Sequence, residues 1–138
     1  MKKKIIILSL SILLIAGMIA LFLAKPKDVT ITDIQMTTEL DENLQPVKPT
    51  NIFPKGTSKI FAWVEWQKSK VNTEVVAKWY YVTDDIRILE YPFAIPKKNG
   101  SGGVSLTMPE GKKFPVGEYR IDITLRNRKL KSQTFKVK

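Results

Sequence analysis

The chain has 138 residues, with 23 basic and 13 acidic side chains, a net charge of +10, and neither cysteine nor histidine. The absence of these two residue types excludes thiol catalysis, the usual serine–histidine dyads and most zinc sites. Five of the basic residues precede residue 28, so the remainder carries a net charge of +5. That excess is too small to indicate a nucleic-acid-binding protein, and we expect no nucleic-acid partner.

An uninterrupted apolar stretch at residues 5–24 follows the lysines at positions 2–4 and is stopped by the polar run 25–28. In a helix, twenty residues span about 30 Å, the hydrocarbon thickness of a bilayer. The stretch is longer than the apolar part of a secretory signal peptide, and Phe22-Leu23-Ala24 is a poor cleavage site. We therefore predict an uncleaved transmembrane anchor at 5–24, a cytoplasmic start at 1–4 and a linker at 25–28, with a cleaved, secreted form as the alternative.

The charges around this stretch predict its orientation. Three lysines and the terminal amine precede it, whereas only Lys25 and Lys27 follow it closely. The more positive flank of a membrane helix stays in the cytoplasm. We therefore expect a single-pass membrane protein whose remaining residues lie in the periplasm or on the surface of a bacterium.

Residues 29–138 are enough for one domain with a core, and their apolar residues recur with the alternation of β-strands. Runs rich in β-branched and aromatic residues are separated by Gly, Pro, Asn and Asp, and no sustained helical period is present. The predicted strands are 29–37, 59–66, 74–83, 86–95, 104–108, 117–126 and 130–137. This pattern predicts an all-β fold, a seven-stranded antiparallel β-sandwich.

The last two predicted strands form a hairpin whose register decides what enters the core. A three-residue loop, 127–129, brings Phe135 opposite Ile121 and Val137 opposite Tyr119. A two-residue loop at 127–128 would turn both Phe135 and Val137 away from the core, because a one-residue slip exchanges the two faces of a strand. We therefore predict the three-residue loop.

Several features resemble an immunoglobulin-like or fibronectin III-like domain of the small, exported bacterial kind. Trp79 lies in the middle of the third predicted strand, where such folds place a core tryptophan. Gly117 and Tyr119 begin the sixth predicted strand in the manner of a tyrosine corner, and the run 53–56, Phe-Pro-Lys-Gly, precedes the second. The resemblance covers residues 29–138 and implies the fold, with structural roles for Trp79, Gly117 and Tyr119.

The charges of the predicted loops are unevenly distributed. Strands of a sandwich alternate in direction, so the loops after the second, fourth and sixth strands share one end, where the first strand also begins. These loops carry eight basic residues and no acidic one: Lys68, Lys70, Lys97, Lys98, Arg126, Arg128, Lys129 and Lys131. The opposite loops have a net charge of −2. We hypothesise that the basic loops face anionic lipid headgroups, each close Lys or Arg contributing about 1 kcal/mol; the alternative is that these are ordinary solvated loops.

Aromatic residues crowd both faces of the second and third predicted strands. Phe61 and Trp63 share one face of the second strand and Trp66 lies on the other, while Tyr80 lies on the third. Since only one face of each strand can meet the core, the other must be covered by the polar segment 38–58, by a protein partner, or by a glycan that stacks on aromatic rings. We take Phe61, Trp63, Trp66 and Tyr80 as the candidate contact surface.

The remaining patterns do not assemble an active site. Asp84-Asp85 is typical of a turn, and 41–43 lacks the ligand spacing of a calcium loop. The glycine-rich run 97–103 has no following helix to direct at a phosphate. We predict no enzyme, metal or cofactor, and interpret the chain as a membrane-tethered binding or scaffolding module, an accessory subunit or partner of a membrane or envelope complex. Envelope glycan binding is the alternative.

Overall fold

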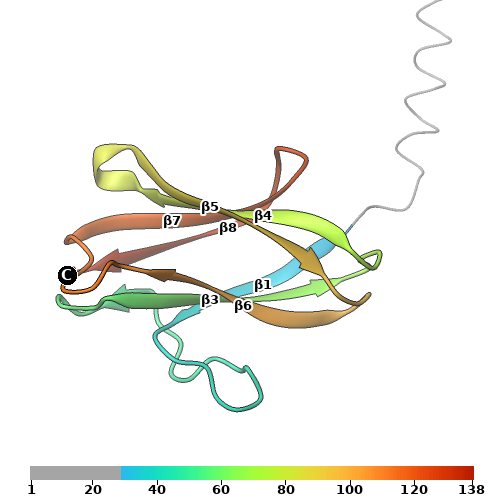
Figure 1. The fold of residues 1–138 in the computed structure, drawn as a ribbon, viewed down its shortest axis with the longest axis horizontal. Coiled ribbons are helices and arrows are strands. Elements are labelled where there is room, and N and C mark those ends of the chain that lie inside the picture. The colour runs from blue at the N-terminus through green and yellow to red at the C-terminus, as the bar shows by residue number, and fades with distance from the viewer. Residues whose placement is uncertain (1–28) are drawn as a thin grey trace, which may run out of the picture.

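Two β-sheets packed face to face make up the part of the chain that the computed structural model describes, residues 29–138 (Figure 1). The elements are β1 (Thr30–Thr37), β2 (Ile52–Phe53), β3 (Lys59–Gln67), β4 (Thr73–Tyr81), the 3-10 turn η1 (Val82–Asp84), β5 (Ile86–Ile95), β6 (Gly100–Thr107), β7 (Gly117–Leu125) and β8 (Arg128–Val137). One sheet has the order β1-β3-β6 and the other the order β2-β8-β7-β4-β5. The predicted anchor at 5–24 lies outside the described residues, and no helix within 29–138 has the length and hydropathy to cross a bilayer.

The predicted all-β sandwich is confirmed, with eight strands instead of seven. The additional strand, β2, is only two residues long and pairs in parallel with the end of β8. Backbone hydrogen bonds hold it against β8. They run from the N–H of Lys136 to the carbonyl of Asn51 and from the N–H of Lys138 to the carbonyl of Phe53. A strand this short has no periodicity that a sequence pattern can register.

The core lies between the sheets and is built around aromatic rings. Trp79, Tyr119, Phe53 and Phe135 are among its largest fully buried side chains. The rings of Tyr119 and Phe135 stack at 5.1 Å, and Trp79 meets Phe135 edge-on at 6.2 Å. These are the favourable geometries for aromatic pairs, and they give Trp79 the core position that the sequence resemblance implies.

A tyrosine corner closes the start of β7. The hydroxyl of Tyr119 donates a hydrogen bond to the carbonyl of Pro115, and burial, followed by the neighbouring Tyr81, raises the pKa of Tyr119 to about 12. Gly117 has φ 151°, and a Cβ on it would approach Tyr81 Cε1 to 2.7 Å and Thr83 Oγ1 to 2.5 Å. The backbone there favours glycine and no space remains for a side chain, so Gly117 and Tyr119 have structural roles.

The β7–β8 hairpin corrects the predicted register. Its turn consists of Arg126 and Asn127, which both have positive φ, and Phe135 pairs with Tyr119. The predicted loop 127–129 is therefore wrong, and its pairs are displaced by two positions. A displacement of two preserves the face of each residue, so Phe135 and Val137 enter the core as expected.

Strand β6 begins four residues earlier than predicted, within the glycine-rich run. Trp66 explains why glycines form a strand here: its ring lies 3.1 Å from the position a Cβ would take on Gly100, and 3.6 Å from that on Gly102. The indole occupies the space that side chains on β6 would otherwise fill. The run 97–103 is therefore in part an ordered edge strand, and not simply the loop that its composition predicts.

Candidate interaction surface

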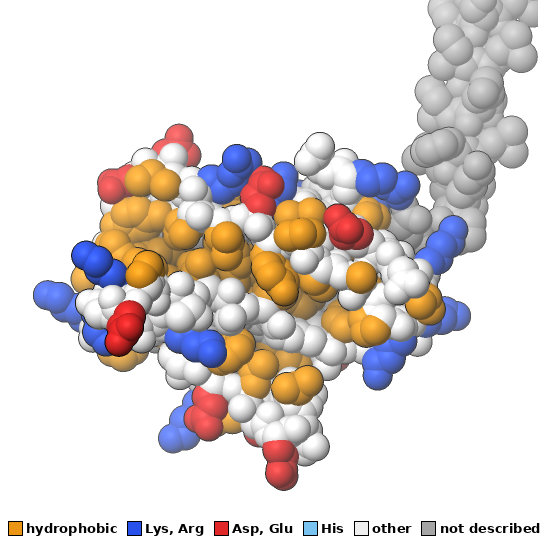
Figure 2. Space-filling model, in the orientation of Figure 1, with side chains coloured by type: hydrophobic (Ala, Val, Ile, Leu, Met, Phe, Trp, Pro, Cys, Tyr) orange, Lys and Arg blue, Asp and Glu red, His pale blue; other side chains and the backbone are white. Residues whose placement is uncertain are grey.

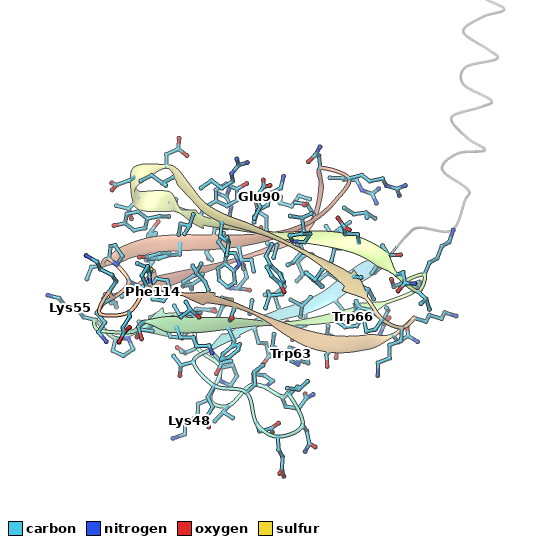
Figure 3. All side chains as sticks on the ribbon, viewed as in Figure 1. Lys48, Lys55, Trp63, Trp66, Glu90 and Phe114 are labelled. Carbon is cyan, nitrogen blue, oxygen red and sulfur yellow. The ribbon has the colours of Figure 1, made fainter. Side chains whose placement is uncertain are left out.

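The outer face of the three-stranded sheet is covered by the chain itself. The segment between β1 and β2 hangs beneath this sheet, and Trp63 on β3 and Lys48 on the segment lie on the same side of the molecule (Figures 1 and 3). Leu40 Cδ1 lies 2.7 Å from the position a Cβ would take on Gly103, the residue paired with Trp63. Trp63, on the same face, is only 6% exposed. The sequence allowed three possible covers for this face: the polar segment, a protein partner or a glycan. In the structure the polar segment lies over it (Figure 1).

The covering segment is held by its own hydrogen bonds. Leu40 and Pro46 form an antiparallel bridge, and the hydroxyl of Thr37 donates to the carbonyl of Val47. The carboxylate of Asp41 accepts bonds from the backbone N–H of Asn43, at 2.8 Å, and of Gln45, at 2.9 Å. The Asp41 side chain therefore stabilises a local turn.

The four aromatic residues of the predicted contact surface do not form one surface. Trp66 is 3% exposed and lies in the core, where its indole N–H donates to the carbonyl of Lys97 at 3.0 Å. Phe61 is half-buried on the outer face of the three-stranded sheet. Tyr80 lies on the other sheet, with the guanidinium of Arg120 at 4.6 Å from its ring centroid. The four candidates therefore lie on both sheets, and two of them, Trp63 and Trp66, are buried.

An exposed apolar surface is present elsewhere, on β5, the outermost strand of the five-stranded sheet. Ile86, Ile88, Leu89 and Tyr91 are 38–51% exposed. Leu89 pairs with Trp79, whose side chain enters the core, so Leu89 also faces the inner side of the sheet. It stays exposed because the opposite sheet, which ends at β6, is two strands narrower. Hydrophobic side chains gather over this part of β5 in Figure 2.

Charged side chains flank the apolar strand on its outward face. Arg87 Nη1 lies 2.8 Å from Glu90 Oε1, and Lys78 Nζ on the neighbouring strand lies 3.9 Å from the same oxygen. A bulge at Ile88 shifts the pairing with β4, so that Leu89 pairs with Trp79 but Arg87 with Tyr80. The sequence pattern did not indicate this exposed apolar strand or its outward ion pair, because aromatic residues are concentrated on the two preceding strands.

The structure brings the predicted basic loops to one end of the sandwich, the end at which β1 begins (Figure 1). The loops after β3 and β5 are joined there by hydrogen bonds from the N–H of Ser69 to the carbonyl of Lys98, at 2.9 Å, and from the N–H of Lys68 to Asn99 Oδ1, at 3.1 Å. Seven of the eight predicted side chains are exposed and Lys131 is half-buried: Lys68, Lys70, Lys97, Lys98, Arg126, Arg128, Lys129 and Lys131. We call these eight residues the basic end.

The opposite end is less acidic than predicted. Glu39, Asp41 and Glu42 belong to the segment folded beneath the three-stranded sheet, as Figure 1 shows for that segment. Asp84 and Asp85, in and after η1, keep a place at that end. A long connection folded against a sheet face does not follow the rule that places short loops at strand ends.

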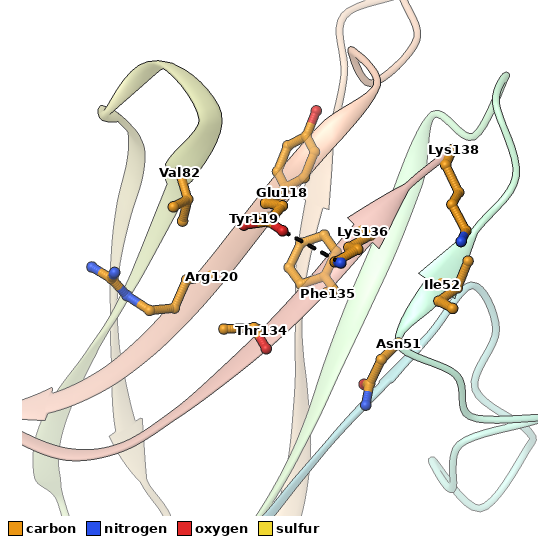
Figure 4. A pocket seen from close by; sticks show the side chains of 10 residues that line it. All are labelled: Asn51, Ile52, Val82, Glu118, Tyr119, Arg120, Thr134, Phe135, Lys136 and Lys138. Carbon is orange, nitrogen blue, oxygen red and sulfur yellow. Dashed lines mark ion pairs between the residues drawn. The ribbon is translucent and has the colours of Figure 1, made fainter.

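A shallow hollow of about 320 Å³ lies on the outer face of the five-stranded sheet (Figure 4). Exposed Ile52 and Val82 line it together with outward side chains of β7 and β8, among which Glu118 and Lys136 form an ion pair at 3.4 Å. Within residues 29–138, no three acidic or metal-ligating side chains gather closely enough to hold a metal ion. The hollow therefore offers apolar walls and one ion pair.

No protein-family model matches the sequence, and no curated protein is detectably related to it. Among solved structures, the chain is similar to an immunoglobulin-like protein from Pseudomonas aeruginosa, with a TM-score of 0.55, 16% identity, and coverage of 81% of this chain and 98% of the other. At this identity the likeness shows the fold alone: residues 29–138 form an immunoglobulin-like β-sandwich.

Two further solved structures are similar at lower scores. The alkylpurine DNA glycosylase AlkC from Pseudomonas fluorescens has a TM-score of 0.49 and 12% identity, and the match covers 83% of this chain but 31% of the enzyme. A Niemann-Pick type C2 protein from the Japanese carpenter ant has a TM-score of 0.48 and 15% identity, with coverage of 83% and 96%. At these scores neither likeness carries an inference about activity or ligand.

Proposed function

We propose that this chain is a protein-binding module whose contact surface is strand β5. The observation that carries this proposal is the exposure of Ile86, Ile88, Leu89 and Tyr91 on one edge strand. Among residues 29–138, the segment 38–51 covers the outer face of the three-stranded sheet, whereas no segment covers β5. Large apolar side chains gathered on an exposed edge are typical of a surface that binds another protein.

The position of the basic end supports display of the module at a membrane. The described chain begins at this end, directly after the segment for which the sequence predicts a transmembrane anchor. Lys and Arg side chains within a Debye length of anionic headgroups are attracted to them. The module is accordingly an extracytoplasmic partner or accessory subunit of a membrane or envelope complex, with its basic end at the lipid surface.

Binding is favoured over catalysis and over glycan recognition by the placement of the side chains. Trp66 is in the core and Trp63 is covered, so two of the three aromatic residues considered for glycan stacking are buried. The outward groups of the hollow, such as Glu118 and Lys136, are engaged in a surface ion pair. We therefore assign the module a binding role and not a catalytic one.

The test of the β5 proposal is site-specific photo-cross-linking in intact cells. A photoreactive phenylalanine analogue replaces Tyr91 in the full-length chain, and Leu44, which is 58% exposed on the covering segment, serves as the matched control position. We expect a covalent protein adduct from position 91 and none from position 44. If position 91 yields no protein adduct, β5 is not a contact surface and the proposal fails.

The lipid contact is tested separately on residues 28–138, which contain the whole core. Replacing Arg126, Arg128, Lys129 and Lys131 with glutamine should weaken salt-sensitive binding to vesicles containing anionic lipid. The control variant removes the same charge elsewhere, at Lys48, Lys55, Lys112 and Lys113. Equal binding by the two variants would contradict a lipid role for the basic end.

A further inference from the structure

The free edge of strand β5 can pair with few other strands. It is the last strand of its sheet, so one side of its backbone has no strand partner among residues 29–138. Two features resist the addition of an arbitrary strand: the bulge at Ile88, and Pro92, which has no N–H to donate. They confine the segment available for pairing to residues 86–91, and they favour a partner whose irregularity matches.

The ion pair on this segment has an uncommon geometry. Residues three apart on a regular strand point to opposite faces, yet Arg87 and Glu90 lie 2.8 Å apart. The bulge between them brings both side chains to the outward face, where Glu90 pairs with Lys78 and Arg87 with Tyr80 across the ladder. The segment therefore presents one positive and one negative charge on the same face, symmetrically placed about the Ile88–Leu89 bond.

We infer that β5 pairs antiparallel with β5 of a second copy of this chain, an inference that rests on the proposed function of this strand. With the two-fold axis between Ile88 and Leu89, Arg87 of each copy lies opposite Glu90 of the other. The same register places Ile86 opposite Tyr91, and Ile88 opposite Leu89, in both halves. Each pair combines either opposite charges or two apolar side chains, which are the pairs that stabilise antiparallel sheets.

Neighbouring registers lack this match. A shift of one residue would set the outward Arg87 against Tyr91 or Leu89, which face the inner side of the sheet. The opposite charges of Arg87 and Glu90 on the outward face, and the inward face shared by Ile86 and Tyr91, thus select one register and one kind of partner. The pairing would join the two five-stranded sheets into one continuous sheet.

The two-fold axis also determines how the pair meets a membrane. Antiparallel pairing places the basic ends of the two copies at opposite ends of the dimer. When both copies are tethered in one bilayer, the strands lie along the membrane, with a basic end at the surface on either side. Side-by-side upright copies would require parallel pairing, which sets Arg87 against Arg87.

Charge-reversal variants distinguish the contact between Arg87 of one copy and Glu90 of the other from the ion pair that these residues form within one chain. In full-length protein in a mild non-ionic detergent, sedimentation equilibrium gives the dimer Kd of the wild type, R87E, E90R and an equimolar mixture of the two variants. Each variant alone places like charges opposite each other twice, and we expect a Kd weakened about tenfold. In the mixture each Glu meets an Arg of the other copy, and dimers should return.

The controls distinguish the possible causes. A chain carrying both R87E and E90R restores the pair within one chain and between copies, whereas the mixture restores only the pair between copies. E118Q, which alters an ion pair away from β5, should leave the Kd unchanged, and circular dichroism checks that each variant folds. If the mixture associates no better than either variant, or if the wild type is monomeric, the inference is overturned.

The photo-cross-linking experiment at position 91 distinguishes self-association through β5 from the more general proposal that β5 binds a protein. A photo-cross-link between two copies of the chain supports both. A cross-link to a different protein, with a monomeric wild type, keeps β5 as a contact surface but overturns the second copy as its partner. No protein adduct at all overturns both.

Discussion

The protein has two apolar surfaces outside the core, the outer face of the three-stranded sheet and strand β5. The first is covered by another segment and the second is exposed. Trp63 on the former is buried beneath the segment 38–51, with Leu40 packed over its neighbour Gly103. Tyr91 on the latter is half exposed, with no covering segment among residues 29–138. The covered face is part of the folded interior, whereas the exposed residues 86–91 of β5 lie outside the core, which the strand enters only near its end, at Ile95. Exposure, and not aromatic content, therefore indicates where a partner binds.

Truncation should reveal this contrast most strongly at Trp63 and Tyr91. Trp63→Ala removes a buried ring and should lower the free energy of unfolding by about 3–5 kcal/mol. Tyr91→Ala removes a half-exposed ring and should cost about 0.5 kcal/mol, as for most surface changes. Urea denaturation of both variants, at a protein concentration below that of association, makes the comparison. Similar losses would mean that β5 is part of the stabilising core.

Leu40 tests whether the segment 38–51 is what covers Trp63. Leu40→Ala should lower the free energy of unfolding by about 1–2 kcal/mol, since Leu40 is only partly buried, and should increase acrylamide quenching of tryptophan fluorescence. Leu44→Ala alters an exposed leucine of the same segment and should change neither. Trp63→Phe in the Leu40→Ala background should abolish the additional quenching, and quenching that persists would contradict the assignment to Trp63.

The stability of the protein at alkaline pH tests the burial of the Tyr119 side chain. The pKa of Tyr119 is about 12 in the folded protein, against an ordinary value of 10.0, because burial disfavours the phenolate. The unfolded chain therefore loses this proton first, and Tyr119 should reduce the free energy of unfolding progressively between pH 10 and 12. Tyr119→Phe should flatten this part of the decline. An equally steep decline in Tyr119→Phe would contradict the assignment.

The sequence predicted what depends on alternation and on strand direction. Strand direction placed the basic loops at one end, and alternation placed Trp66 on a different face from Phe61 and Trp63. Alternation shows which residues share a face, but not which face the second sheet will cover. That ambiguity put the buried Trp66 on a predicted surface.

The open strand could not be predicted because its exposure depends on the width of the other sheet. The pattern of residues 86–95 is the same whether a strand lies beyond β6 or not. The bulge at Ile88 was likewise hidden, since it arises from pairing with β4 and leaves no signature in composition. The width of the other sheet depends on contacts between residues distant in sequence, which a single sequence does not display.

The smallest effect on stability should come from the charges of β5. Glu90 and Arg87 are both well exposed, and a surface ion pair contributes about 0.2–1 kcal/mol, less at high salt. Glu90→Gln should therefore barely change the free energy of unfolding, and Glu118→Gln, which removes the pairing of Glu118 with Lys136, should change it as little. The two variants should differ only in self-association, which Glu90→Gln weakens and Glu118→Gln does not. A loss of several kcal/mol in Glu90→Gln would instead make this ion pair part of the fold, and the charges of β5 would lose their claim to a role in binding.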